Sequence, residues 1–329
     1  MANGSRPHRE RILQLGAESN IVAIATEADP GPGERSGPGP DRPMVIFLNA
    51  GVLHRVGPHR LHVVLARRLA RSGFPCLRLD LSGIGDSRGV PGDLTFRASA
   101  VADTRAAMDR IAADSGIVRF VLFGLCSGAD NALATAEADP RVVGLILIDA
   151  PAYATRHAHW RDVRRRVSIR LRQPIPATRH YLRSLGARFR RLARRFGERR
   201  RPGDHPDSES AGRQSPPKAE YGELLTRLLD RGIRILGVYS GSLGRRYNHR
   251  DQLFEVFPAL RGRLELAFFP LANHVFTELA QRNALIELVA RWSGESFTWR
   301  CPFRAPPLAG SPGTCSSAWA RGWCSSSAR

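Results

Sequence analysis

Residues 118–138 hold the sequence feature that most limits how this chain can fold. The segment starts with the apolar run VRFVLFG, continues through Gly-Leu-Cys-Ser-Gly at residues 124–128, and ends in the helical pattern ADNALATAEA. Glycines at positions 124 and 128 permit a turn too tight for side chains at either place. The segment therefore predicts a buried strand that passes through a strained turn directly into a helix.

Similar apolar runs recur along the chain and alternate with helical patterns. The runs expected to form strands are 21–26, 44–51, 75–83, 118–124, 142–150, 233–241 and 264–270. The helical patterns cover 59–73, 96–114 and 282–292. Such alternation predicts the α/β class, with a mostly parallel sheet flanked by helices on both faces. Residues 21–26 are expected to add an early antiparallel strand.

Composition divides the chain into five expected segments. Residues 1–43 form an N-terminal segment with the early strand and a Pro/Gly linker, and 44–150 form the first part of the core. Residues 151–220 form a basic insertion, partly disordered, that follows the sixth strand in the position of a lid. The second part of the core spans 221–298, and 299–329 form a disordered tail.

The formal charge of +20 raises the question of a nucleic-acid partner. Residues 151–220 contain 19 basic and 6 acidic residues, but Lys218 is the single lysine among the 50 basic residues of the chain. This bias toward arginine, without a zinc-finger, helix-turn-helix or aromatic RNA-binding motif, argues against nucleic acid. No apolar stretch reaches the roughly 18 residues of a membrane span, so none is expected.

Five cysteines are present, and their spacing fits neither a metal motif nor a disulfide framework. They are Cys76, Cys126, Cys301, Cys315 and Cys324. The odd number and the absence of an apolar leader favour a reducing, cytoplasmic location. No metal and no cofactor is expected.

The turn at residues 124–128 has the form of a nucleophile elbow, Gly-x-nucleophile-x-Gly, with Cys126 in the nucleophile position. Such a site needs two backbone amides to bind the oxyanion. One is expected from Ser127, the residue after the nucleophile, and the other from Val52 in the earlier LNAGVLHR turn. Ser127 is out of register as a nucleophile because its side chain lies one step further round the turn.

Three motifs together resemble the α/β-hydrolase superfamily. They are LNAGVLHRVGPHRLHVVLARRLARSGFPCLRLDLSGIGDS at residues 48–87, FGLCSGA, and ANHVF. More narrowly, they resemble serine-aminopeptidase-like hydrolases associated with exopolysaccharide or natural-product gene clusters, over residues 44–150 and 230–292. The resemblance implies a triad of nucleophile, histidine and acid. It also implies a structural role for the DLSGIGDS turn, so Asp86 and Ser87 are not expected to be catalytic.

The sequence indicates the histidine of the implied triad more clearly than the acid. His274 follows the last expected strand and precedes the final helix, where the family keeps its base. The usual acid position, after the strand at 233–241, holds Leu243 and Gly244. Asp251 is preferred because its segment belongs to this loop, and Asp149, at the end of the preceding strand, is the alternative.

A cysteine nucleophile is chemically compatible with a weakly marked acid. A helix N-terminus and a protonated histidine both favour the thiolate, so a Cys–His pair depends less on a carboxylate than a Ser–His pair does. The sequence thus predicts an acyl hydrolase or acyltransferase acting on a small-molecule or carrier-bound ester or thioester, with the basic lid suited to an anionic substrate. The alternative is a non-catalytic binding or scaffold protein with this fold. A nucleic-acid or membrane-surface binder is a third possibility, supported by charge alone.

Overall fold

The computed structural model describes residues 9–16, 19–28, 42–89, 94–172 and 215–297. Its centre is a sheet of eight strands in the order β1-β2-β4-β3-β5-β6-β7-β8. The strands are β1 Glu10–Leu15, β2 Ile21–Thr26, β3 Met44–Phe47, β4 Cys76–Leu79, β5 Phe120–Leu125, β6 Val142–Ile148, β7 Arg234–Ser240 and β8 Glu265–Phe269. The pairs β1–β2 and β2–β4 are antiparallel, and all other pairs are parallel.

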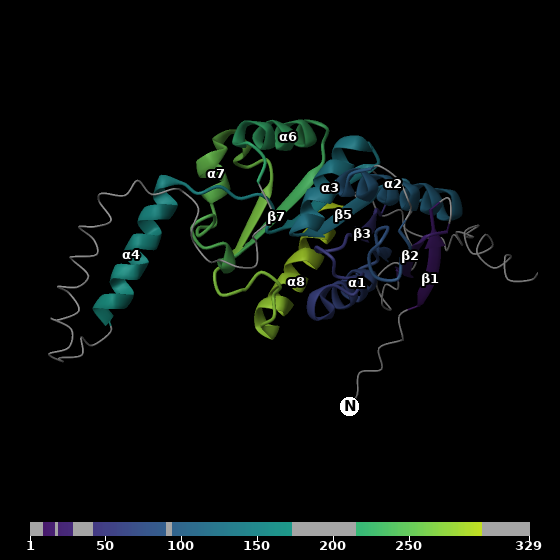
Figure 1. Cartoon of the computed structure of the whole chain (residues 1–329), viewed down its shortest axis with the longest axis horizontal. Helices are drawn as coiled ribbons and strands as arrows, with labels where there is room; N and C mark the ends of the chain where they lie inside the picture. Colours follow the sequence, from purple (N-terminus) through teal and green to yellow (C-terminus); the bar gives the residue numbers. More distant parts are fainter. Residues whose placement is uncertain (1–8, 17–18, 29–41, 90–93, 173–214, 298–329) are drawn as a thin grey trace, which may run out of the picture. The chain divides into compact units, whose positions relative to one another are not determined.

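Seven α-helices belong to the described ranges and are connected to this sheet (Figure 1). They are α1 Leu61–Arg71, α2 Phe96–Ser115, α3 Ser127–Ala138, α4 Arg156–Arg172, α6 Lys218–Asp230, α7 Gln252–Val256 and α8 Leu279–Ser296. Short 3-10 turns occupy Pro58–Arg60, Gly241–Leu243 and Pro258–Leu260. None of the described helices is both long and apolar enough to cross a lipid bilayer.

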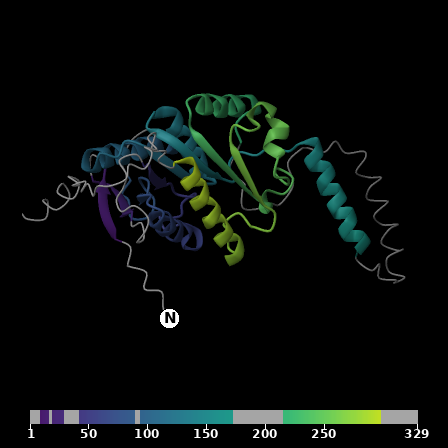
Figure 2. The same cartoon turned by 180° about the vertical axis from the view of Figure 1, so that it is seen from behind.

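Two apolar cores cover the two faces of the sheet. On one face, Met108 of α2, Leu133 of α3 and Leu225 of α6 pack with Ile46 and Leu122 of the central strands. On the other face, side chains from α1 and α8 pack against alternate residues of the same strands. Figures 1 and 2 show the ribbons of these two helices beside the sheet. Because the central parallel strands β3, β5 and β6 are covered on both faces, their sequences are continuously apolar and do not alternate.

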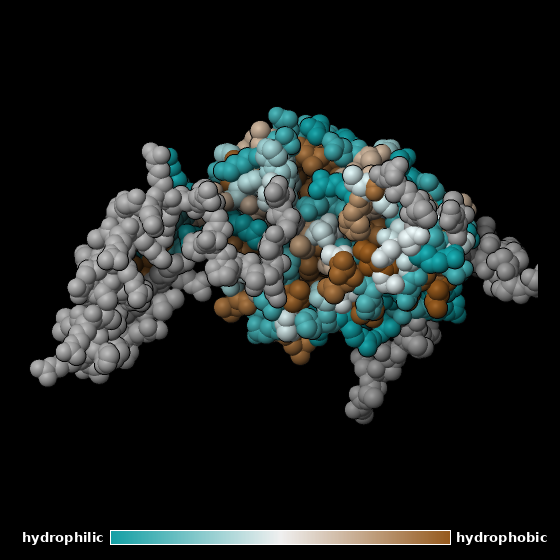
Figure 3. Space-filling model, in the orientation of Figure 1, coloured by the Kyte–Doolittle hydropathy of each residue, from teal (hydrophilic) through white to brown (hydrophobic). Residues whose placement is uncertain are grey.

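The face of the described residues that Figure 3 shows carries no comparable apolar layer. Figure 3 shows hydrophilic side chains over much of one face, with hydrophobic residues in smaller patches between them. Burial of apolar residues is therefore concentrated at the sheet, where it stabilises the layers.

The predicted architecture is confirmed in its main points: a mostly parallel sheet with helices on both faces, and an antiparallel strand at residues 21–26. The sequence analysis missed β1, in which only Leu15 is buried and which includes two charged side chains. In the expected insertion the structure shows α4 directly after β6, while residues 173–214 lie outside the described ranges. The expected disordered tail at 299–329 lies outside them as well.

Candidate active site

Cys126 lies between β5 and α3 in a strained backbone conformation, with φ 57° and ψ −119°. The turn requires its glycines: a Cβ on Gly124 would lie 2.2 Å from the carbonyl oxygen of Gly128. A Cβ on Gly128 would lie 2.7 Å from the carbonyl oxygen of Asn49. Unfavourable backbone geometry of this kind persists only where the surroundings enforce it, and it is concentrated at functional sites. The side chain of Cys126 is presented at the N-terminus of α3.

His274 comes from the loop between β8 and α8 and contacts a buried carboxylate. Its Nδ1 lies 2.7 Å from Oδ2 of Asp149, the residue that directly follows β6. The Asp149 side chain is fully buried, whereas the imidazole of His274 is 28% exposed. Asp149 also has a positive φ of 48°. The carboxylate therefore fixes one ring nitrogen of His274 and leaves Nε2 for a second partner.

Electrostatics around His274 favour the imidazolium. The hydrogen bond to Asp149, followed by the hydrogen bond to Cys126, raises the pKa of His274 to about 9. Both interactions outweigh partial burial, which acts in the opposite direction. At neutral pH a cationic His274 thus lies between a carboxylate and a thiol, an arrangement that favours the thiolate.

The turn after β3 is hydrogen-bonded both to the elbow and to the turn after β4. The Gly51 amide donates to Oγ of Ser127 at 2.8 Å. The Asn49 side chain donates to Oδ1 of Asp80 at 3.1 Å, and the Leu81 amide donates to Oδ1 of Asn49 at 2.8 Å. The turn that carries Val52 is therefore placed next to the nucleophile position, and the Ser127 hydroxyl is engaged in holding it there.

The DLSGIGDS turn supports this arrangement structurally. Asp80 is fully buried and accepts hydrogen bonds from the Asp86 amide and from the guanidinium of Arg55. Arg55 also pairs with the exposed Asp86 at 2.6 Å, and the Ser87 hydroxyl donates to the Asp80 carbonyl at 2.7 Å. These contacts give Asp86 and Ser87 places in the packing of two turns.

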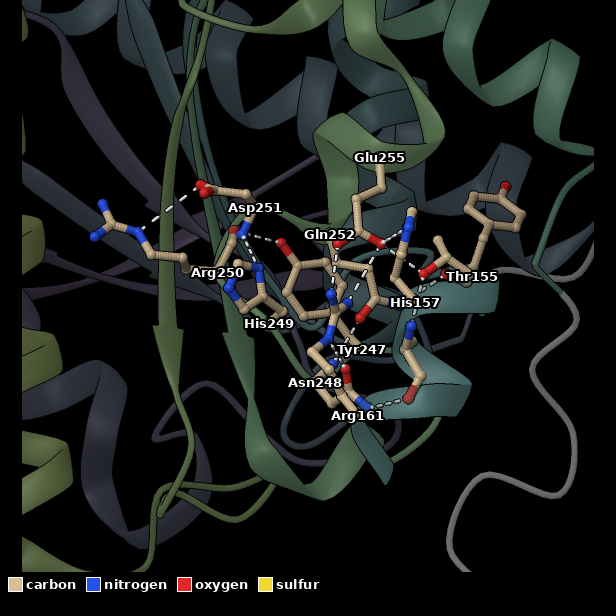
Figure 4. Close-up of polar contacts among 12 residues, drawn as sticks. Thr155, His157, Arg161, Tyr247, Asn248, His249, Arg250, Asp251, Gln252 and Glu255 are labelled. Carbon is tan, nitrogen blue, oxygen red and sulfur yellow. Dashed lines mark hydrogen bonds and ion pairs between the residues drawn. The ribbon is translucent and has the colours of Figure 1, made fainter. Parts of the chain in front are cut away.

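Asp251, the preferred acid of the sequence analysis, does not contact the histidine in the interactions that the structure gives. It is the residue before α7, its side chain is 41% exposed, and it pairs with Arg250 at 3.8 Å (Figure 4). The contacts favour the alternative acid, because Asp149 lies at hydrogen-bond distance from His274. The physical reason is that β6 and β7 are adjacent parallel strands, so their carboxyl ends reach the same edge of the sheet.

One buried polar residue of this site was not identified from the sequence. Ser240, the last residue of β7, is fully buried and binds both carboxylate oxygens of Asp149, through its amide at 2.7 Å and its hydroxyl at 2.7 Å. A serine at the end of a strand is too common to be a sequence signal. His59, in the 3-10 turn before α1, makes a local contact, with Nε2 3.2 Å from Oγ1 of Thr277.

The described residues contain no group of three or more His, Cys, Asp or Glu side chains that could hold a metal ion. The functional groups available for chemistry around Cys126 are a thiol, an imidazole, a carboxylate and backbone amides. Such a set is suited to nucleophilic acyl transfer.

Sequence comparisons with known proteins match part of the chain. A family model described as serine aminopeptidase, S33, matches residues 51–200. The human protein ABHD12B is 31% identical over 112 residues, which are 33% of this chain and 29% of that protein, so the match spans less than a third of the relative.

Solved structures agree with the sequence matches at the level of the fold. A puromycin-hydrolyzing peptidase of Mycobacterium tuberculosis has a TM-score of 0.52 at 15% identity, covering 89% of this chain and 39% of that one. A meta-cleavage product hydrolase from Pseudomonas fluorescens has a TM-score of 0.50 at 15% identity, covering 87% and 98%. The chain therefore has the α/β-hydrolase fold.

Proposed function

We propose that the protein is an acyl hydrolase or acyltransferase that uses the thiol of Cys126 as nucleophile, with His274 as proton carrier and Asp149 as its acid partner. The observation that carries this proposal is the continuous contact from Cys126 through His274 to the buried Asp149. Each of the three follows a strand or lies in the loop after one, at the carboxyl edge of the sheet. Ligands of open α/β sheets bind outside this edge.

In the proposed reaction the thiolate of Cys126 attacks the carbonyl carbon of an ester or thioester and forms a C–S bond. The carbonyl electrons move to oxygen, giving a tetrahedral oxyanion. When this collapses, the bond to the leaving alcohol or thiol breaks, and His274 donates its proton to that group. Neutral His274 then accepts a proton from water or an acceptor hydroxyl, which attacks the acyl-cysteine and releases the thiolate.

The oxyanion is expected to bind the backbone amides of Val52 and Ser127. Removal of one such donor typically costs about 10²- to 10³-fold in rate. The bond from the Gly51 amide to the Ser127 hydroxyl supports this role, because it ties the turn that carries Val52 to the start of α3. Ser127 would thus act through its amide and through its support of the turn.

A cationic His274 is suited to a thiol, and the interaction with Cys126 is itself one of the causes that raise its pKa, after the hydrogen bond to Asp149. A protonated imidazole cannot remove a proton from a serine, but it stabilises a thiolate that has already formed. The residue at the elbow and the charge of its neighbour are therefore chemically matched. Asp149 supports the cation by hydrogen bonding to Nδ1.

We infer the class of substrate from the positive charge of α4. This helix contains seven arginines and one aspartate and begins seven residues after Asp149. Its first turns are attached to α7, because Arg161 and Thr155 both bind Glu255, at 2.7 and 2.6 Å (Figure 4). We propose that the segment acts as a basic lid and that the acyl group is presented by an anionic molecule or carrier.

The experiment that tests this function is detection of the acyl-enzyme. The full chain is mixed with p-nitrophenyl acetate or with acyl thioesters of a short thiol, then quenched in acid and analysed by intact mass and peptide mapping. We expect one acyl group on Cys126, no adduct in Cys126→Ala, and an adduct formed about 3- to 10-fold more slowly in Ser127→Ala. An adduct on Ser127 that survives Cys126→Ala would contradict the proposal, and no adduct with any ester would favour the binding-protein alternative.

A further inference from the structure

Asp149 is held by two groups of a single neighbouring residue. The Ser240 amide donates to Oδ1 and the Ser240 hydroxyl to Oδ2, each at 2.7 Å. Oδ2 is also the atom that lies 2.7 Å from Nδ1 of His274. The Ser240 hydroxyl and the histidine therefore meet at the same carboxylate oxygen.

The Ser240 hydroxyl is itself oriented by a second hydroxyl. Its Oγ lies 2.6 Å from Oγ of Ser242, in the 3-10 turn after β7. Since the Ser240 proton is directed to the carboxylate, Ser242 is the donor in this second contact. A chain of donors then runs from Ser242 through Ser240 to Asp149 and meets His274 at Oδ2.

These contacts stabilise and orient a carboxylate that is buried. Asp149 and Ser240 are both fully buried, and burial of a carboxylate is costly unless hydrogen bonds replace its hydration. A hydrogen bond to a charged group contributes more than one between neutral groups. Two donors on two oxygens also fix the plane of the carboxylate, because rotation about its terminal bond would break at least one contact.

We infer that Ser240, oriented by Ser242, is a positioning residue that fixes Oδ2 of Asp149 at bonding distance from His274. This inference rests on the proposed function, in which Asp149 is the acid partner. The hydroxyl of this pair belongs to the last residue of β7, and the carboxylate belongs to the residue that follows β6. The residue acts through Asp149 and does not touch the acyl group.

The test compares Ser240→Ala with a matched control in the full-length protein. Ser293 of α8 is equally buried, and its hydroxyl has no hydrogen-bond partner among the described residues, so Ser293→Ala removes a buried hydroxyl away from the site. The readout is the rate of Cys126 alkylation by iodoacetamide between pH 5 and 10. We expect Ser240→Ala to slow alkylation at pH 6.5 about 5- to 30-fold, Ser242→Ala about 2- to 3-fold, and Ser293→Ala less than 2-fold.

The pH profile separates positioning from a general loss of structure. The pKa of His274 is raised to about 9 chiefly by its bond to Asp149, and Cys126 is its other charged or ionisable neighbour in the site. A carboxylate held less firmly stabilises the imidazolium less, so the alkaline transition is expected at lower pH in Ser240→Ala. A slower rate with an unmoved transition would overturn the inference.

A double-mutant cycle with Asp149→Asn distinguishes the inference from the proposed function. If Ser240 acts through Asp149, adding Ser240→Ala to Asp149→Asn slows the alkylation of Cys126 by less than a further 2-fold. An undiminished effect there would overturn the inference while leaving Asp149 as the acid. If Asp149→Asn alone has no effect, the proposed function itself fails. Should Ser240→Ala not fold, Ser242→Ala in the same cycle decides the question in the same way.

Discussion

The turn after β5 and the loop after β7 form two parts of the candidate active site, yet they differ in how clearly the sequence predicts them. At the first, residues 124–128 meet a local steric requirement, with two glycines where a Cβ would collide with backbone atoms. At the second, the expected carboxylate is missing, and Asp149 of the neighbouring strand contacts His274. A turn that depends on local backbone geometry can be recognised from its glycines in the sequence. A contact between side chains that are distant in the chain leaves no such local pattern.

The largest expected effect concerns the turn itself. In Gly124→Ala the new Cβ would lie 2.2 Å from a backbone oxygen, and no flexible side chain can move aside. We expect the free energy of unfolding to fall by more than about 4 kcal/mol, measured by urea denaturation, or the chain not to fold.

Gly294→Ala is the control for that substitution. Gly294 lies inside α8, and a Cβ there would meet no atom within 4 Å. Because alanine favours a helix over glycine, we expect stabilisation of about 0.5–1 kcal/mol. Equal destabilisation by both substitutions would show that residues 124–128 impose no special constraint.

The next effect distinguishes the two carboxylates. Asp149→Asn removes the charge beside His274 and is expected to lower acyl-transfer activity about 10²- to 10³-fold, less than in a serine enzyme because a thiolate needs less assistance. Asp251→Asn changes an exposed residue that pairs with Arg250 and is expected to change kcat/KM by less than 2-fold. The reverse order of effects would restore Asp251 as the acid.

The smallest effect is the dependence of stability on pH. The folded-state pKa of His274 is raised from 6.5 to about 9, so the folded state binds its proton more tightly than the unfolded state. The resulting stabilisation is fully present below pH 6.5, declines between pH 6.5 and 9, and is lost above pH 9. We expect the free energy of unfolding of wild type to exceed that of His274→Asn by about 1–3 kcal/mol at pH 6 and by much less at pH 9.5. Urea denaturation at each pH measures this difference. A difference that grows with pH would contradict the raised pKa.

The sequence predicted the fold better than it predicted the site. Continuous apolar runs between helical patterns predicted which segments form the parallel strands, because strands buried on both faces are apolar along their length. The order of these strands in the sheet was not predicted. The register of β6 against β7, which brings Asp149 and Ser240 together, depends on contacts 91 residues apart in the chain. Asp149 was recognised only as an alternative, and Ser240 was missed, because neither contact has a local signature.

The most direct test of the central claim is the reactivity of Cys126 toward iodoacetamide at pH 6 to 7, mapped by mass spectrometry in wild type and in His274→Ala. The account predicts labelling of Cys126 much faster than that of Cys301, and a clear slowing in the mutant, because the imidazolium stabilises the thiolate. Labelling of Cys126 no faster than that of Cys301, or equally fast without His274, would contradict an activated Cys–His pair.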